Sequence, residues 1–467
     1  MANNFLIQHI SKGTARFFAS ASIAIGILST IGLSSSRAWA DSFDTSNIPS
    51  LAQIDIQTIN QQCSTINNVV VFPPNLRQAE TPSQKKTLNT DAKIVESSNK
   101  FGFKLFSEIL KGDQAENNVF ISPSSVAIAL AMVYNGASGT TQLAIAKTLE
   151  LQALNLQEIN SSYKMALKQL LDNSDPKIQL KIANSLWANQ NVSFRPDFLQ
   201  RTQDFYQAKV SNLNFQDPAA PSIINNWVKE NTNGKIDQII GNIEPKDVLF
   251  VINAIYFKGQ WSQEFDKSQT AQYPFYSTSG KPKQYPMMSQ SGDYRYYESN
   301  QFQAVSLPYG KDGKFSFYIF LPKQDSNLKA FYQNLNVENW EKWMTQFCEQ
   351  EGFIRLPRFT TEYDVTLNDA LKTLGMKEAF SYKANFSAMS KVPDLYISEV
   401  KHKTFLEVNE EGTEAAAITL VNGSGATGFS GSLIPPFQMI VDRPFFCAIR
   451  DNQTGRILFM GSIIEPQ

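Results

Sequence analysis

Histidine and cysteine are scarce in this chain. Two histidines (His9, His402) and three cysteines (Cys63, Cys348, Cys447) occur among 467 residues. His9 lies in a segment that we expect to be removed, and a zinc site built on histidine needs two or three such ligands. Three cysteines are also too few for the disulfide framework of a small exported domain. The sequence therefore predicts no metal site, and stability must come from a hydrophobic core.

Neither sign of charge dominates the chain. Lys and Arg number 42 against 43 Asp and Glu, which gives a net charge of −1. The basic patch that binds nucleic acid is absent, so we expect no nucleic-acid partner. Lys164 and Lys168 form one helix-spaced pair, which is typical of a solvated helix face.

Catalytic patterns are also missing. A Ser-His-Asp hydrolase would have to use His402, and no G-x-S-x-G elbow precedes a helix. We therefore expect a protein that is not an enzyme.

Only one long apolar run occurs, and it lies near the N-terminus. Lys12 and Arg16 precede the apolar residues 17–33, and Ala38-Trp39-Ala40 offers a cleavage site of small residues. This pattern predicts a signal peptide over residues 1–40 and a secreted product, extracellular or periplasmic, with no membrane contact after cleavage. The alternative is an uncleaved membrane anchor, because the run approaches spanning length. Residues 41–94 are rich in Gln, Asn, Ser and Thr and predict a poorly ordered leader segment.

The domain that we expect over residues 95–467 has helices first and strands later. Phe103, Phe106 and Ile109 recur at helical spacing, and Ser122-Pro-Ser-Ser125 is expected to cap an apolar helix. Further helices are expected to about residue 240, with Trp187, Phe198 and Trp227 as their anchors. Strands are expected at 248–257, 315–322, 353–359 and 395–408, and a hairpin at 444–451 and 456–464. This order predicts an α+β fold with large antiparallel sheets.

A glycine-rich segment matches the dinucleotide-binding pattern G-x-G-x-x-G at Gly423, Gly425 and Gly428. That pattern functions only where a helix begins at the glycines, because the helix N-terminus holds the pyrophosphate. Pro435 and Pro436 follow instead, so the segment predicts an exposed loop between two strands and no cofactor. A dehydrogenase is the alternative, which equilibrium dialysis with a nucleotide tests.

The residues before this loop carry conflicting signals. Ala and Glu in 413–418 favour a helix, whereas the neighbouring segments favour strands. In an extended chain, residues 413, 415, 417 and 419 would share one face, and all four are small. Such a face could enter a sheet without overpacking it, with Gly412 as a pivot. The alternative is an alanine-rich surface helix.

Several segments, in the same order along the chain, resemble the serpin family of serine protease inhibitors. They are NVFISPSSVAIALAMVYNGASGTT (118–141), NWVKENTNGKI (226–236), VINAIYFKGQW (251–261), LPRFTTEYDVTLNDALKTLGM (356–376), NEEGTEAAA (409–417) and DRPFFCAIRDNQTGRILFMGSIIEP (442–466). The resemblance covers the chain from about residue 95. It implies three β-sheets, eight or nine helices and an exposed reactive-centre loop.

The resemblance also implies roles for individual residues. The hinge would comprise Gly412, Thr413, Glu414, Ala415, Ala416 and Ala417. A buried polar cluster, the shutter, would comprise Ser122, Ser125, Asn253 and His402. The breach, at the top of the main sheet, would comprise Trp261, Arg358 and Glu410. Ile418 stands where the family usually has alanine. In an extended chain it lies on the face opposite to residues 413, 415, 417 and 419, which points outward, so we expect insertion to be retained.

The implied function is that of a suicide-type inhibitor, acting as a monomer, which traps the acyl-enzyme by inserting its cleaved loop into the main sheet. Counting from Gly412 places the reactive bond at Ala426–Thr427, and counting back from Pro444 places it near Phe429 or Ser430.

The loop composition then suggests the target. No Lys or Arg occurs from 422 to 442, which disfavours trypsin-like targets and favours elastase- or subtilisin-like ones, with chymotrypsin-like enzymes as the alternative. The rival function is a non-inhibitory binding or chaperone protein with the same fold. A large, charged or proline residue on the small face of 413–419 would favour that rival.

Overall fold

Helices come first in the described chain. The computed structural model describes residues 82–112, 117–172, 175–278, 281–413 and 435–467. The described α-helices are α4 (Pro82–Ile109), α5 (Pro123–Tyr134), α6 (Gly139–Thr148), α7 (Leu156–Leu171), α8 (Pro196–Tyr206), α9 (Ala220–Asn231), α10 (Leu328–Asn334), α11 (Val337–Met344) and α12 (Asn368–Leu371). The expected cap is present at α5, where the Ser122 side chain accepts a hydrogen bond from the Ser125 amide.

The first helix begins earlier than expected. We expected order from residue 95, whereas α4 begins at Pro82 and Ile94 is already fully buried. The first turns of α4 are polar and carry no apolar periodicity, so no helical signal is present in that part of the sequence. The predicted signal peptide, and residues 41–81 of the predicted leader, lie outside the described residues.

The strands form two hydrogen-bonded sheets. The six-stranded sheet has the order β10 (Phe359–Thr366), β11 (Glu399–Val408), β4 (Leu249–Gln260), β2 (Ile178–Asn189) and β3 (Lys209–Leu213), and the short β12 (Gly412–Thr413) also pairs with β4. The nine-stranded sheet has the order β1 (Val119–Ile121), β15 (Ile457–Ile463), β14 (Phe445–Asp451), β8 (Phe315–Pro322), β7 (Phe302–Pro308), β6 (Lys283–Glu298), β9 (Cys348–Pro357) and β13 (Phe437–Ile440), with β5 (Ala271–Phe275) on β6.

The third sheet implied by the resemblance is continuous with the second among the described strands. The 16-residue strand β6 pairs with β5 and β9 over most of its length and with β7 at its end. One long strand therefore joins what would otherwise be two sheets.

Strands β2 and β3 occupy a region where we expected only helices. Trp187, expected as a helical anchor, lies in β2 and is buried. The segment contains Lys, Ala and Leu, which favour helices locally, but β2 pairs with β4 about 70 residues later in the chain. Non-local pairing of this kind leaves no local signature. The C-terminal hairpin is confirmed, because β14 and β15 pair antiparallel.

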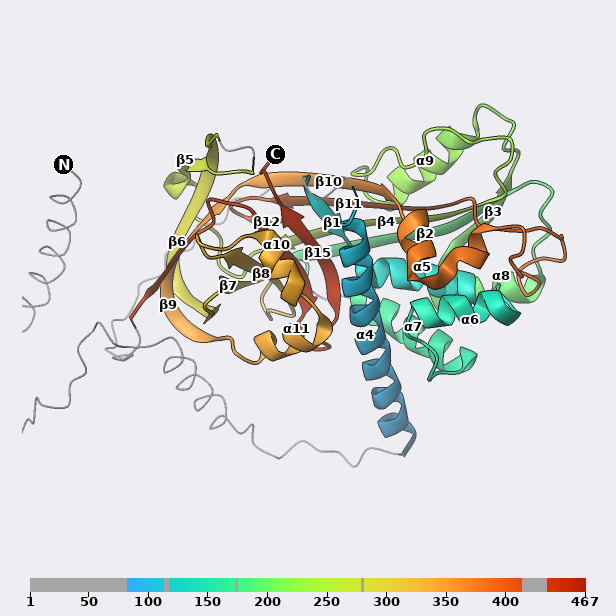
Figure 1. Ribbon diagram of the computed structural model, residues 1–467, viewed down its shortest axis with the longest axis horizontal. Helices are drawn as coiled ribbons and strands as arrows, with labels where there is room; N and C mark the ends of the chain where they lie inside the picture. The colour runs from blue at the N-terminus through green and yellow to red at the C-terminus, as the bar shows by residue number, and fades with distance from the viewer. Residues whose placement is uncertain (1–81, 113–116, 173–174, 279–280, 414–434) are drawn as a thin grey trace, which may run out of the picture. The chain divides into compact units, whose positions relative to one another are not determined.

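Strand β4 separates two cores. Figure 1 shows the long strands β10, β11, β4 and β2 running side by side, with α5 to α8 on one side and α9 on the other. Phe250, Ile252 and Ala254 pack into the core beneath α9, whereas Leu249, Val251 and Ile255 pack into the larger core that includes α5. Asn253 faces the second side, so one polar side chain enters an otherwise apolar face.

Within the described chain, none of the helices combines the length and the apolar composition that crossing a membrane requires.

Candidate functional site

A parallel strand pair forms the centre of the six-stranded sheet. Strands β4 and β11 pair in parallel from Phe250–Glu399 to Tyr256–Phe405, and His402 lies directly beside Asn253. Because register partners present their side chains on the same face, both residues point toward the N-terminus of α5.

His402 and Asn253 connect the two strands to the helix. The Ser122 amide donates to His402 Nε2 (3.0 Å), which leaves the proton on Nδ1, and Nδ1 donates to Asn253 Oδ1 (2.6 Å). Asn253 Nδ2 donates to Ser125 Oγ and to Asn184 Oδ1, each at 2.5 Å. The structure thus brings together all four predicted shutter residues and adds Asn184, which the sequence did not suggest.

Burial determines the protonation of this cluster. His402 is fully buried, and burial lowers its pKa to about 3. A neutral ring is also what its contacts need, since Nε2 accepts a hydrogen bond. Separating β4 from β11 would break the His402–Asn253 bond, so the cluster holds the two strands together.

A tight turn connects β11 to β12. Asn409 Oδ1 accepts hydrogen bonds from the amides of Glu411 (3.1 Å) and Gly412 (3.2 Å), and its Nδ2 donates to Glu407 Oε1 (3.2 Å). Asparagine commonly stabilises turns by such bonds to backbone amides two residues on. The turn reverses the chain, so β12 runs antiparallel to β4, with Gly412 opposite Gln260 and Thr413 opposite Gly259.

Only glycine fits at position 412. Its φ is +147°, and a Cβ there would lie 2.1 Å from the Gly259 carbonyl oxygen and 2.5 Å from the Gln260 Cα. Contacts this short with backbone atoms cannot be relieved by a side-chain movement. The pivot inferred from the sequence is thus also a point of very close approach to β4.

Thr413 is already buried in the intact chain. Its Oγ1 lies 2.8 Å from the Tyr309 hydroxyl, and the Tyr309 ring stacks on Trp261 with centroids 4.5 Å apart. Burial raises the pKa of Tyr309 well above its usual value, so its hydroxyl remains protonated. The first residues of the hinge, Gly412 and Thr413, therefore already occupy the sheet before any cleavage.

Trp261 supports the turn from the other side. Its Nε1 donates to the Asn409 carbonyl (2.9 Å), and its amide donates to the Glu411 carbonyl (2.9 Å). The side chain is almost wholly buried. The breach position implied for Trp261 is therefore in direct contact with the turn that begins the hinge.

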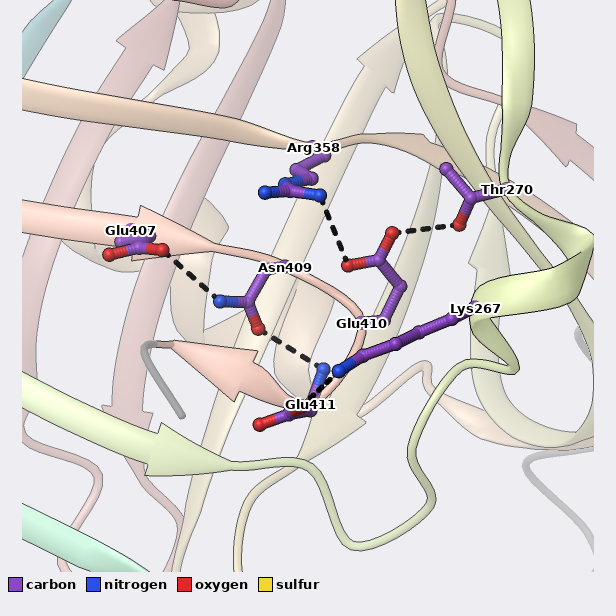
Figure 2. A pocket seen from close by; sticks show the side chains of 7 residues that line it. All are labelled: Lys267, Thr270, Arg358, Glu407, Asn409, Glu410 and Glu411. Atoms are coloured by element: carbon purple, nitrogen blue, oxygen red, sulfur yellow. Dashed lines mark hydrogen bonds and ion pairs between the residues drawn. The ribbon is translucent and has the colours of Figure 1, made fainter. Parts of the chain in front are cut away.

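A polar cavity of about 440 Å³ lies beside this turn (Figure 2). Buried Glu410 accepts a hydrogen bond from the Thr270 hydroxyl (2.8 Å) and lies 3.8 Å from the half-exposed Arg358, which is a long ion pair. Lys267 pairs with Glu411, and this bond raises the pKa of Lys267. The second oxygen of Glu411 is buried without a hydrogen-bond partner. The implied Arg358–Glu410 pair is thus present but weakly held.

The remaining predicted positions cannot be placed. Residues 414–434 lie outside the described residues, and they include Glu414 to Ala417 of the hinge and the bond candidates Ala426, Thr427, Phe429 and Ser430. The chain is described again from Pro435 and enters β13, which pairs in parallel with β9.

Sequence reasoning missed Tyr309, Asn409 and Lys267. Asn409 before Glu-Glu-Gly is a turn signal that could have been recognised. Tyr309 carried no signal, because its partner Thr413 lies 104 residues away. Among the described residues, no group of three His, Cys, Asp or Glu side chains could hold a metal ion.

Comparisons with known proteins show which family has this arrangement. A family model described as serpin (serine protease inhibitor) matches residues 96–466. The leukocyte elastase inhibitor of Bos taurus is 36% identical over 380 residues, covering 79% of this chain and 98% of its own. The native structure of the thermophilic serpin tengpin aligns with a TM-score of 0.72 at 32% identity, covering 80% of this chain and 94% of its own. Human thyroxine-binding globulin, solved with its ligand, aligns with a TM-score of 0.74 at 27% identity, covering 82% and 100%.

Proposed function

The chain belongs to the serpin family, and on that premise we propose that it inhibits serine proteases by inserting its cleaved reactive-centre loop into the six-stranded sheet. One observation carries the proposal. The residues that begin the hinge, Gly412 and Thr413, already pair with the end of β4, beyond the point where β4 and β11 cease to pair. The loop therefore has a starting position for a new strand between them.

The geometry of the central strands favours that insertion. Because β4 and β11 are parallel, a strand that follows β11 through a tight turn and enters between them runs antiparallel to both. Parallel pairing is slightly less stable per residue than antiparallel pairing. Insertion replaces one parallel ladder with two antiparallel ladders, so the number of backbone hydrogen bonds increases.

The chemistry starts at the bait residue, which we place at Ala426. The protease serine attacks its carbonyl carbon, an ester forms, and the bond to the Thr427 nitrogen breaks as that nitrogen takes a proton from the protease histidine. Residues 413–426 are then free at one end. Extended, they span about 45 Å at about 3.3 Å per residue, which exceeds the roughly 40 Å of the 12-residue strand β4. Insertion carries the ester-linked protease with it and distorts its active site before water can release it.

We propose elastase- or subtilisin-like enzymes as targets. The loop offers small residues and no basic residue from 422 to 442, and the related leukocyte elastase inhibitor supports a target of this class. We also propose that residues 1–40 direct export, so the target would be met outside the cytoplasm. No cofactor takes part in this mechanism.

Mixing the purified chain with elastase-, subtilisin-, chymotrypsin- and trypsin-like enzymes tests the function. We expect a complex that survives boiling in detergent, and mass spectrometry of the released C-terminal peptide identifies the cleaved bond. Cleavage without any stable complex would support the second candidate, a non-inhibitory binding protein, which thyroxine-binding globulin shows to be compatible with this fold.

A further inference from the structure

Cys348 takes part in a disulfide, although the chain has few cysteines. It begins β9 and is disulfide-bonded, whereas Cys447 is a buried free thiol. The whole sequence contains three cysteines, so Cys63 is the remaining candidate within the chain. We propose that a disulfide joins Cys63, in the leader segment, to Cys348 and fastens the leader beside the C-terminal end of the reactive-centre loop.

The surroundings of Cys348 and Cys447 explain why Cys348, and not Cys447, forms the disulfide. Cys348 is half-buried at the open end of its strand, with its sulfur 3.9 Å from the Tyr296 carbonyl oxygen. Cys447 lies in the centre of β14 with no exposed surface, and burial raises the pKa of its thiol far above the usual value. Because the thiolate is the species that attacks a disulfide, Cys447 is inert to exchange while the chain is folded.

Cys348 lies on the face of β9 that the chain contacts as it returns from the loop. Side chains alternate along β9, so Cys348, Gln350 and Gly352 share one face. Gln350 Nε2 donates to the Pro435 carbonyl (2.8 Å), the first described residue after the loop. The Phe437 ring covers Gly352 and stacks on Tyr296 at 3.8 Å. The chain returning from the loop therefore packs on the face that bears Cys348.

Formation of the disulfide requires a two-electron oxidant. Two thiols, at Cys63 and Cys348, lose two protons and two electrons to a low-molecular-weight or protein disulfide, which leaves as two thiols. Such oxidants act in exported compartments and not in the reducing cytosol. The inference rests on the proposed export, but not on protease inhibition.

The consequence is that the leader survives proteolysis as part of the molecule. Lys85 and Lys86 follow Cys63, so a trypsin-like enzyme could cut the leader from the chain. With the disulfide intact, the fragment that contains Cys63 remains attached next to the loop. Reduction then releases it.

Peptide mapping of the full-length chain, secreted from an oxidising compartment, tests the bond. Free thiols are alkylated in denaturant and the protein is digested with trypsin without reduction. We expect residues 41–77 linked to residues 343–355, one alkylated cysteine per chain before reduction and three after. Reduction should separate the two peptides.

Variants provide the matched controls. Cys63→Ser and Cys348→Ser should each raise the number of free thiols from one to two, whereas Cys447→Ala should lower it to zero and keep the linked peptide. Free Cys63 and Cys348 in the wild type, a link through Cys447, or a covalent dimer through Cys348 would each overturn the proposal. Protease trapping, measured on the same samples, reports separately on the proposed function.

Discussion

His402 is the residue whose chemistry most directly connects the shutter to solution conditions. It is fully buried and neutral, and burial lowers its pKa from the usual 6.5 to about 3. In the unfolded chain the ring takes up a proton below about pH 6.5, whereas in the folded chain it does not. Protons therefore favour the unfolded state as the pH falls from 6.5 toward 3, and this part of the stability is present above pH 6.5.

The expected size follows from one pKa unit being worth about 1.4 kcal/mol. Between pH 7.5 and pH 5, His402 should contribute a loss of about 2 kcal/mol in the free energy of unfolding. His402→Gln removes the titrating group, so its stability should fall by that much less over the same interval. Denaturant titrations of both proteins at the two pH values measure the difference. Parallel pH dependences would show that His402 does not govern this range.

Ala426 is the residue on which the proposed specificity depends. A trypsin-like pocket pairs a buried carboxylate with Lys or Arg, and leaving that carboxylate unpaired is costly. Ala426→Arg should therefore raise the association rate with a trypsin-like protease by at least about 100-fold and lower it with elastase-like enzymes. Stopped-flow or progress-curve kinetics with the four protease classes give these rates.

Phe429→Ala is the matched control for that substitution. If the bond lies at Ala426–Thr427, Phe429→Ala should leave the ranking of proteases unchanged. Loss of chymotrypsin-like inhibition in Phe429→Ala, with no change in Ala426→Arg, would move the reactive bond to the later position. Strong trypsin-like inhibition by the wild type would contradict both assignments.

Among the elements, β12 was only partly anticipated from the sequence. The alternation of small residues predicts that 413–419 suits a sheet, and of these residues the structure describes only Thr413, in β12. Nothing local indicated that Thr413 is already inside the sheet. Its burial depends on Tyr309, on Trp261 and on the end of β4, which lie more than 100 residues away. Local patterns specify which face a strand presents, whereas pairing partners depend on the whole fold.

The same division applies to the other elements. The hairpin of β14 and β15 was predictable because its strands and turn are contiguous, with Gly455 at a φ of +80° in the turn. Strands β2 and β3 were missed because their partners are distant. His402, Asn253 and the two serines came from family resemblance, since no spacing in the sequence relates residues 122 and 402.

Thr413→Arg tests whether the hinge must enter the sheet. The substitution places an unpaired charge where the side chain is fully buried, at a cost of several kcal/mol. Because Thr413 is buried before cleavage as well, the variant should release the β12 pairing in the intact protein and block insertion afterwards. We expect the protease to cut the loop and leave, so the detergent-stable complex should disappear while cleaved product accumulates.

Glu414→Arg is the control for charge at this position of the chain. In the inserted strand that we propose, alternation would turn residue 414 to the side opposite Thr413, so an arginine there need not be buried among the core side chains. The control should retain most of the trapped complex on a denaturing gel. Wild-type yields of complex from Thr413→Arg would contradict insertion as the inhibitory mechanism of this chain.

If the proposed insertion operates, the intact molecule is not the most stable arrangement available to the chain. Its central strands are parallel and held by the polar cluster around His402 and Asn253, and Gly412 and Thr413 pair with the end of β4. The unbroken loop is tied at Thr413 and at Pro435, whose carbonyl is bound by Gln350. Cutting the loop releases one of these two constraints.

Cleavage between residues 422 and 430 should therefore raise the melting temperature sharply. If insertion adds roughly ten backbone hydrogen bonds at about 1 kcal/mol each, the gain is about 10 kcal/mol. At about 2 °C per kcal/mol for a domain of this size, the rise is on the order of 20 °C. Calorimetry of the intact and nicked proteins measures this rise in melting temperature.

Nicked Thr413→Arg should show no such rise, because the cut alone only loosens the chain. A rise that requires a small residue at 413 therefore identifies insertion as its cause. Equal melting temperatures of intact and nicked wild type would instead indicate a relaxed, non-inhibitory member of the family.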